Sequence, residues 1–389
     1  MTSAELVELD LGDLALDEGA HLLIKRALAD ARSIIVRGTA SSLQVDLPAW
    51  CRANGHAIAE RGRGYEITRG PDRWAGAERA GSVGSPSHHA PARWGLAARG
   101  ALVEAGTPVL EFAIADRQTT WAEEAPRMYA HAAAAQWDPA SAIPWDEVID
   151  HPPEVEDAIV QVMTYLIENE TAALLVPARF LARLHPHFRE VMQLLAIQAA
   201  DEARHIEVFT RRARLRRDEL GLSTAGGQAS LATLFDEHDF AIASFLLSVL
   251  GEGSFLALLW FLRDHAPDAC TRAVAQLAAQ DEARHVAFGL AHLQRHVGED
   301  PGLRGRLAAA IERRHAALAH TAGLNAEVFD ALILLAAGSW EPVALRRGHA
   351  AVVALQRTMD DHRRQHLVRL GFDQATAARL SSLHTRNFM

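Results

Sequence analysis

The chain has 389 residues, of which 49% are hydrophobic and 23% charged, and its formal net charge is -10 at pH 7. This length predicts two or three domains, and the excess of acidic side chains argues against nucleic acid as a partner. No uninterrupted apolar run reaches membrane-spanning length, because Glu252 interrupts the most apolar stretch, and the acidic N-terminus lacks a signal-peptide pattern, so we expect a cytoplasmic protein without a membrane partner.

Residues 1–70 predict a small domain of their own. Strands are expected at 6–11, 33–37, 56–60 and 64–68, and helices at 17–30 and 47–54, the second of them led by Pro48. The resulting order βαβαββ predicts a two-layer α+β domain.

This domain resembles the TusA/SirA-like sulfur-carrier fold. The resemblance lies in Leu9-Asp10-Leu11-Gly12-Asp13-Leu14, a following helix, Asp46-Leu47-Pro48-Ala49-Trp50-Cys51 and Gly55-His56. In that family a Cys-Pro-x-Pro motif opens the first helix and carries sulfur. Here the matching residues are Ala15-Leu16-Asp17-Glu18, so the nucleophile of the family is missing, and we interpret Cys51 as a buried small hydrophobic residue.

Residues 71–107 are rich in Gly, Pro, Ser and Ala, which predicts a linker or extended segment. Residues 108–389 are dominated by Ala- and Leu-rich stretches, which predict helices. Two long helical hairpins are expected at 154–217 and 231–296, with turns at Pro186 and at Ala266-Pro267. Further helices are expected at 302–320, 325–337 and 341–370, and one more short helix in the tail, 371–389.

The helical part contains one pentapeptide twice, as Asp201-Glu202-Ala203-Arg204-His205 and as Asp281-Glu282-Ala283-Arg284-His285. In each copy the Glu and the His are three residues apart and therefore lie on one face of a helix. Two such pairs, with one Glu from each of the two remaining helices, hold two metal ions in four-helix bundles. Packing alone would not require the same charged pentapeptide twice, so we predict that Glu202, His205, Glu282 and His285 bind metal.

The positions of the two turns identify the remaining ligands. Glu170 and Glu202 each lie 16 residues from Pro186, and Glu252 and Glu282 each lie 15 residues from Pro267. Two residues at equal distances from the turn of a helical hairpin lie at the same height along the helix axes. Glu170 therefore lies opposite Glu202, and Glu252 opposite Glu282, which predicts Glu170 and Glu252 as ligands. The alternative to Glu170 is Glu168, which would lie about 3 Å out of level and has more polar neighbours.

Residues beside these ligands are expected to orient them. Asp201 and Asp281 are candidates to accept a hydrogen bond from a ligand histidine, and Arg204 and Arg284 to pair with those carboxylates. The four glutamates balance the charge of two divalent ions. A set rich in oxygen and free of thiolate suits iron or manganese better than structural zinc.

The spacing from Glu170 to 201–205 and from Glu252 to 281–285 resembles the E-x(28–37)-DExRH signature of ferritin-like di-iron oxygenases, such as arylamine N-oxygenases and relatives of the ribonucleotide reductase small subunit. The resemblance implies a ferritin-like four-helix bundle with two iron ions, or Mn/Fe or Mn in their place, and O2 as co-substrate. It also implies a small-molecule substrate and an external electron donor. Ala278 stands where arylamine N-oxygenases carry a third histidine, so the site departs from that pattern and resembles a set of four glutamates and two histidines. The type of oxidation, whether hydroxylation, N-oxygenation or desaturation, stays open.

Two other classes of function remain open beside an oxygenase. One is a peroxide- or iron-handling protein of the ferritin, rubrerythrin or manganese-catalase type, although the CxxC site of rubrerythrin is absent. The other is a binding protein stabilised by its metal, which predicts a tightly packed bundle without a pocket near the ions. We expect a homodimer, because helical faces of this size often pair.

For an oxygenase we expect a mostly apolar pocket beside the ions. The candidate lining residues are Met163, Ala173, Phe245, Phe255 and, as a polar contact, Ser248. Tyr165 is interpreted as a buried, hydrogen-bonded core tyrosine in preference to a redox-active one.

Overall fold

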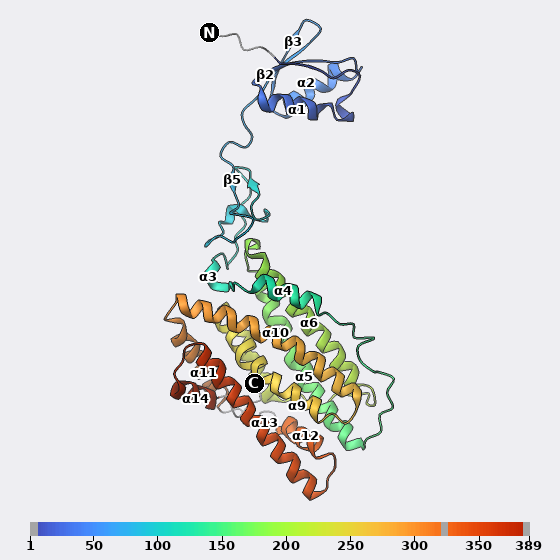
Figure 1. Ribbon diagram of the computed structural model, residues 1–389, viewed down its shortest axis with the longest axis vertical. Coiled ribbons are helices and arrows are strands. Elements are labelled where there is room, and N and C mark those ends of the chain that lie inside the picture. Colours follow the sequence, from blue (N-terminus) through green and yellow to red (C-terminus); the bar gives the residue numbers. More distant parts are fainter. Residues whose placement is uncertain (1–6, 320–325, 384–389) are drawn as a thin grey trace. The chain divides into compact units, whose positions relative to one another are not determined.

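The computed structural model describes residues 7–319 and 326–383 (Figure 1). The chain forms two compact units, one of Met1–Arg79 with Leu102–Thr107 and one of Ala80–Ala101 with Pro108–Met389. The segment predicted as a linker is thus divided between the two units. The fold class is confirmed: a small α+β unit and a mainly helical unit built on a four-helix bundle.

The first unit has the predicted order of elements. They are β1 (Val7–Asp10), α1 (Ala20–Asp30), β2 (Ser33–Arg37), α2 (Leu43–Ala53), β3 (Ala57–Arg61) and β4 (Gly64–Thr68), with a short 3-10 turn, Leu16–Glu18, before α1. The strand order is β1-β2-β4-β3, with β1 parallel to β2 and the other pairs antiparallel. The parallel pair needs a crossover, which α1 supplies. A further short pair, β5 (Glu78–Arg79) and β6 (Leu102–Val103), belongs to the same unit.

The starts of both helices in this unit differ from the prediction, which placed them at residues 17 and 47, and α1 begins only at Ala20, after the 3-10 turn. Helix α2 begins at Leu43, so Pro48 lies inside the helix and not at its start. Leu43 and Leu47 both face the core, and their burial offsets the backbone hydrogen bond that Pro48 cannot make. Cys51 is fully buried in this core, and burial raises the pKa of its thiol to about 11, as expected for a small hydrophobic residue.

The second unit is helical from α3 onward. Its elements are α3 (Arg117–Thr120), α4 (Ala125–Ala134), α5 (Pro153–Leu181), the 3-10 turn Pro186–Phe188, α6 (Arg189–Ala213), α7 (Ala225–Phe235), α8 (Phe240–Ser244), the π-helical segment Phe245–Glu252, α9 (Gly253–Asp264), α10 (Ala269–Glu299), α11 (Leu303–Leu318), α12 (Ala326–Ala337), α13 (Pro342–Arg369) and α14 (Gln374–Ser382).

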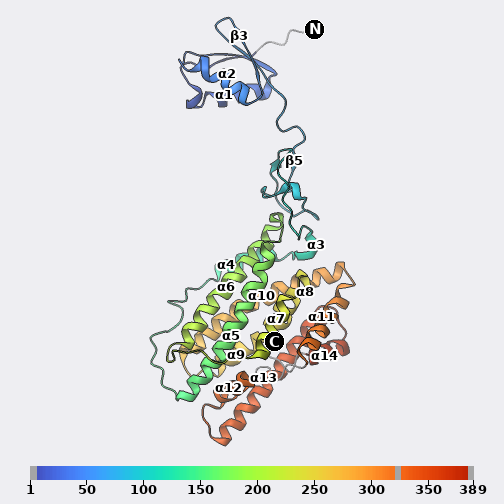
Figure 2. The same ribbon diagram turned by 180° about the vertical axis from the view of Figure 1, so that it is seen from behind.

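The bundle consists of two antiparallel hairpins, α5 with α6 and α8–α9 with α10, which lie side by side in both views (Figure 2). Both predicted turns are confirmed, at Pro186 and at Pro267. The predicted start of the second hairpin at residue 231 is wrong, because α7 is a separate helix. Asp239 begins the hairpin by capping α8, where its carboxylate accepts the N–H of Ile242 at 3.1 Å.

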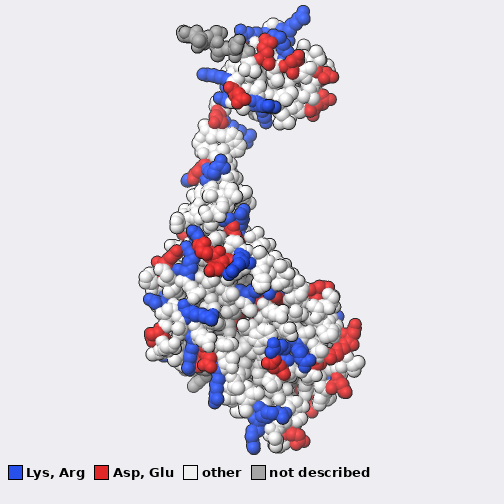
Figure 3. Space-filling model, in the orientation of Figure 1, with Lys and Arg blue, Asp and Glu red and all other residues white. Residues whose placement is uncertain are grey.

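Two helices of the described chain, Pro153–Leu181 and Phe240–Asp264, are long and apolar enough to cross a membrane, or up to three if the bent pair α12–α13 counts as one. By length and composition, the prediction that no segment reaches this length is wrong. However, 67% and 89% of the most apolar stretches of the two single helices are buried inside the protein. Packing within the bundle therefore accounts for their apolar character. On the face shown in Figure 3, acidic and basic side chains are interspersed.

A buried ion-pair network at one end of the bundle joins three helices. Arg212 of α6 is fully buried and donates to Glu156 of α5, at 2.8 and 3.1 Å, and to Asp268 before α10, at 2.7 Å. Replacing Arg212 by alanine removes the cation from two buried carboxylates and leaves Glu156 with only His151 and Asp268 with only Thr271 as partners. We therefore expect a loss of about 3–5 kcal/mol in the free energy of unfolding, measured by urea denaturation. The matched control is Arg217→Ala, which breaks a partly exposed pair with Asp157 and should cost under about 1 kcal/mol. Equal losses in the two variants would contradict this role.

Candidate metal centre

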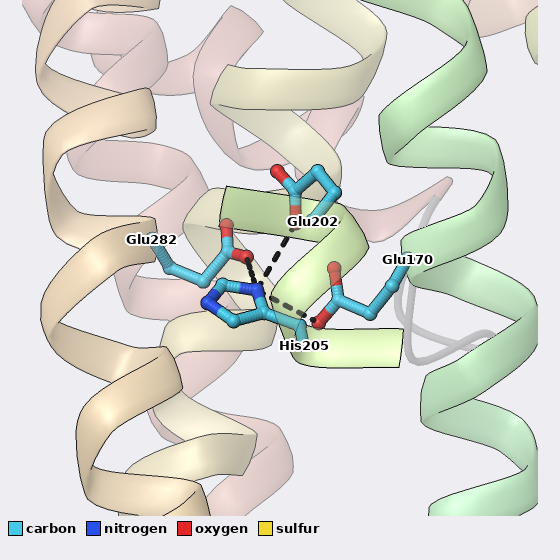
Figure 4. A group of neighbouring side chains, drawn as sticks. All are labelled: Glu170, Glu202, His205 and Glu282. Atoms are coloured by element: carbon cyan, nitrogen blue, oxygen red, sulfur yellow. Dashed lines mark hydrogen bonds and ion pairs between the residues drawn. The ribbon is translucent and has the colours of Figure 1, made fainter. Parts of the chain in front are cut away.

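Six predicted ligands from four helical segments meet in the middle of the bundle. The structure forms two overlapping groups in which the potential ligand atoms lie within 4.8 Å of one another: Glu170, Glu202, His205 and Glu282 in the first, and Glu202, Glu252, Glu282 and His285 in the second. Figure 4 shows the first group, with the imidazole of His205 among the three carboxylates. All six side chains are buried. Glu202 and Glu282 belong to both groups, so each would offer ligand atoms to two ions.

The structure distinguishes Glu170 from Glu168, the alternative candidate ligand. Glu170 is 2% exposed and belongs to the first group, whereas Glu168 is half-buried and belongs to neither. The argument from equal hairpin arms therefore selects the glutamate that joins the cluster.

The two histidines are held crosswise by the aspartates of the opposite pentapeptide. His205 Nε2 lies 3.1 Å from Asp281 Oδ2, and His285 Nε2 lies 3.2 Å from Asp201 Oδ2. The Nδ1 atom of each ring consequently faces the glutamates. The predicted contact between aspartate and histidine is present, and the structure adds that each aspartate orients the histidine of the other helix.

The predicted arginine pairs are also present. Arg204 donates to Asp201 Oδ1 at 2.5 Å and to Asp281 Oδ2 at 2.7 Å, and Arg284 donates to Asp281. Burial alone would raise the pKa of Asp281, but the hydrogen bond with His205 and, after it, the guanidinium groups of Arg204 and Arg284 lower this pKa below its usual value. An ionised aspartate accepts the Nε2–H of the histidine and so leaves Nδ1 for a metal ion.

Two residues of this support were not predicted. Trp137 donates its Nε1–H to Asp281 Oδ2 at 2.8 Å, and Gln136 donates to Asp201 Oδ1 at 2.8 Å. Both follow α4, which packs against α6 and α10. Gln136 and Trp137 precede Asp138-Pro139 in a segment without a recognisable metal-binding motif. Their role is visible only from where they lie in the structure.

Without metal, the cluster must take up protons. Burial, then the neighbouring Glu202 and Glu282, raise the pKa of Glu170 well above its usual value. Burial, then Glu282, do the same for Glu252. Burial alone would lower the pKa of the two histidines, but the carboxylates around them outweigh it and raise both. Protons on two imidazoles and two carboxyl groups supply four positive charges, the same number as two divalent ions.

The donor atoms of the cluster fit a pair of metal ions. Within the described residues, six of them have no well-aligned hydrogen bond: Glu170 Oε1, Glu202 Oε1, Glu252 Oε2, both carboxylate oxygens of Glu282, and His285 Nδ1. Most of them form only ion pairs within the cluster, such as His285 Nδ1 with Glu202 Oε1 at 2.9 Å. Buried polar atoms without a partner are rare in folded proteins. Oxygen and imidazole ligands from a thiolate-free set match iron or manganese.

The segment that carries Glu252 is π-helical from Phe245 to Glu252, which was not predicted. Such segments are rare and are frequently found at functional sites. Nδ1 of His366, in α13, lies 3.2 Å from the carbonyl oxygen of Val249. On the other side, Gly289 of α10 allows close packing, because a Cβ atom there would lie 2.8 Å from Cβ of Ser248. Neighbouring helices therefore hold the irregular turn that presents Glu252.

A small cavity lies near the cluster, and none of the six predicted ligands lines it. It has room for about one water molecule, with a volume of about 20 Å³. Its lining is formed by Val176, Pro177, Phe180, Leu195, Gln198, Phe240, Ser244, Leu247, Ser248 and Phe288. Gln198 also donates to Glu252 Oε1 at 3.1 Å, which connects the cavity to the cluster.

Of the residues predicted to line a pocket, Ser248 lines this cavity. The other four, Met163, Ala173, Phe245 and Phe255, are buried in the bundle and are not part of its lining. A sequence shows which residues face the bundle interior, but the space left between side chains depends on how the four helices pack.

The crosswise hydrogen bonds make a site-specific prediction. Asp281→Asn should weaken binding of the ion next to His205 and Glu170, because the amide no longer selects the histidine tautomer. Asp201→Asn should weaken binding of the ion next to His285 and Glu252 for the same reason. We expect about 10- to 100-fold lower affinity for the affected ion. Anomalous diffraction from manganese-soaked crystals of each variant locates the loss. Asp157→Asn, on the exposed face of α5, is the control, and loss of the same ion in both variants would contradict the crosswise arrangement.

Comparison with known protein families and with curated proteins finds no match to this sequence. Among solved structures, a protein from Synechococcus with aldehyde deformylating oxidase activity is similar with a TM-score of 0.42 and 18% identity, covering 59% of this chain and 96% of that one. A single-residue variant of an R2-like ligand-binding oxidase with a Mn/Fe cofactor has a TM-score of 0.48 and 18% identity, covering 64% and 93%. Another variant of that oxidase, with a Fe/Fe cofactor, has a TM-score of 0.44 and 18% identity, covering 68% and 94%.

Proposed function

We propose that this chain is a non-haem di-iron oxidase or oxygenase that uses O2 to oxidise a small organic molecule. The observation that supports the proposal is the buried set of four glutamates and two histidines, whose potential ligand atoms form two overlapping groups and lie close enough to share two ions. Mn/Fe and Mn are alternatives to two iron ions, because the ligand set suits both metals.

In this proposal Glu170, Glu202, His205, Glu252, Glu282 and His285 would hold the metal pair. Two bound iron ions supply the binding and reduction of O2. The protein itself positions the metal ligands and keeps water away from the cluster. Asp201 and Asp281 hold the histidine rings in one orientation, and the apolar side chains around the cluster exclude water from it.

Electrons from outside are part of the proposal. Reduction of O2 to water takes four electrons, and a two-electron oxidation of the substrate supplies only half of them. The chain has two cysteines, Cys51 and Cys270, which are buried and lie far apart in the sequence, so they form no CxxC site for electron transfer. We therefore infer a separate electron donor.

The alternative is a binding protein that uses metal for stability alone, which predicts a bundle without a pocket at the ions. The cavity near the cluster holds about one water molecule and none of the six ligands lines it, so oxygen uptake, and not the cavity, distinguishes the two classes.

Oxygen uptake by the iron-loaded protein tests the proposal. The protein is loaded with Fe(II) under anaerobic conditions, reduced and then mixed with aerated buffer. We expect O2 consumption that requires iron and is absent from zinc-loaded protein and from Glu282→Ala. Iron-loaded protein that consumes no O2 would contradict the proposal, and rapid consumption of hydrogen peroxide without reductant would favour the peroxide-handling class.

A further inference from the structure

A groove between α4 and α10 lies next to the second pentapeptide. Its volume is about 420 Å³, which falls within the usual range of small-molecule sites, about 300–1,000 Å³. The groove shares no residue with the six predicted ligands or with the small cavity near the cluster. Three residues of α4 and four of α10 line it: Arg127, Met128, His131, Gln280, Ala283, Arg284 and Ala287.

The lining of the groove suits a flat aromatic ring. Ala283 and Ala287 are four residues apart and therefore neighbours on one face of α10, where their small side chains leave a flat apolar surface. Met128 lines the α4 side, and its flexible thioether makes favourable contacts with aromatic rings. Guanidinium groups, of which the groove has two, stack on the faces of such rings.

Arg127 gives the groove a cation that is available to an anion. Its side chain is exposed, and Glu123, one turn before it on the chain, pairs with Arg117 and Arg295 instead. No acidic residue of the described chain lines the groove. A phosphate group bound here would accept two parallel hydrogen bonds from the guanidinium of Arg127.

Arg284 connects the groove to both ligand histidines. Its guanidinium donates to Asp281, whose Oδ2 atom lies 3.1 Å from Nε2 of His205. Its Nη2 atom also lies 3.7 Å from Oδ2 of Asp201, and that oxygen lies 3.2 Å from Nε2 of His285. Two side chains therefore separate a molecule in the groove from a ligand of either ion, which is a short path for electrons.

The size of the groove favours a small molecule over a protein as the electron donor. A stable interface between two proteins takes about 20–30 residues from each partner, whereas seven residues line this groove. Flavin nucleotides combine a flat aromatic ring, a phosphate group and the chemistry of electron transfer.

We propose that this groove binds a reduced flavin nucleotide, which is the electron donor of the metal centre. The inference rests on the proposed function and names its redox partner. The phosphate lies against Arg127, and the ring lies against Ala283 and Ala287. The fully reduced flavin loses two electrons and two protons and becomes oxidised flavin. The electrons reduce two iron(III) ions to iron(II), and the protons leave to solvent.

Binding of flavin mononucleotide and of riboflavin, which lacks the phosphate, is measured by calorimetry on zinc-loaded full-length protein. We expect flavin mononucleotide to bind about tenfold more tightly than riboflavin. Arg127→Met should remove this preference, whereas Arg272→Met, at an exposed arginine of α10 outside the groove, should retain it. Ala287→Trp should fill the groove and abolish binding of both flavins, whereas Ala130→Trp, at an exposed position of α4 outside the groove, should not.

The absence of binding, equal binding of the two flavins, or an unchanged preference in Arg127→Met would overturn the proposal. Tight binding by Ala287→Trp would do the same. Ala287→Leu is the second variant if Ala287→Trp does not retain its metal, and it should weaken the binding of both flavins.

A second measurement tests electron transfer from the groove. Iron(III)-loaded protein is mixed with reduced flavin mononucleotide in the absence of O2, and oxidation of the flavin is followed by absorbance. We expect a rate that saturates as the flavin concentration increases and that is lost in Ala287→Trp. A rate that does not saturate, or that is unchanged in this variant, would contradict transfer from the groove. Because neither measurement involves O2, a failure of the oxygen-uptake experiment leaves these results independent.

Discussion

Glu282→Ala is expected to lose both metal ions, whereas Glu170→Ala and Glu252→Ala are each expected to keep one. Glu282 belongs to both groups of potential ligands, so its loss removes a donor from each ion and leaves two like-charged sites without their shared carboxylate. Glu170 and Glu252 each belong to one group. Metal content per chain, measured by mass spectrometry after loading and desalting, should therefore fall from two to about zero for Glu282→Ala and to about one for the other two variants.

Glu168→Ala is the matched control for this series. Glu168 lies two residues before Glu170 on the same helix, but it is half-buried and outside both groups. The variant should retain two ions. One ion in Glu282→Ala, or two in Glu252→Ala, would contradict the assignment of ligands, and loss of metal in Glu168→Ala would show that the series reports on folding and not on coordination.

Binding of two divalent ions near neutral pH is expected to release about four protons. The metal-free cluster holds them on His205, His285, Glu170 and Glu252, whose pKa values are all raised. Metal ions need the deprotonated forms of these groups. Calorimetry in two buffers of different ionisation enthalpy measures the number of protons released. Release of one proton or none would show that the cluster is not protonated in this way.

The same groups set the pH dependence of stability. In the folded metal-free protein, the pKa of each of the four groups lies above its ordinary value, which is 4.5 for glutamate and 6.5 for histidine. Their contribution to stability is therefore present below those values and is lost as pH rises toward the raised pKa values. Metal affinity changes in the opposite direction, increasing with pH. Thermal unfolding between pH 6 and 9 should show metal-free protein losing stability relative to metal-loaded protein as pH increases.

The ligand cluster could be predicted from sequence because helix geometry determines it. A Glu and a His three residues apart share a face in any α-helix, and equal distances from Pro186 and Pro267 place Glu170 and Glu252 at the level of their partners. Both relations depend only on the number of residues between two positions of the same helix or hairpin, and this number can be counted in the sequence.

Features that depend on contacts between hairpins could not be predicted. The crosswise pairing of His205 with Asp281 is set by the approach of α6 to α10, and each pentapeptide by itself permits a contact within its own helix. The apolar run that becomes π-helical reads equally well as α-helix, and the contacts of His366 and Gly289 that support it come from elsewhere in the chain.

Anomalous diffraction at the iron edge from crystals of the iron-loaded protein tests the central assignment most directly. We expect two iron peaks between Glu202 and Glu282, one within bonding distance of His205 and Glu170 and the other within bonding distance of His285 and Glu252. A single peak, or peaks away from these six side chains, would contradict the assignment of a two-metal centre.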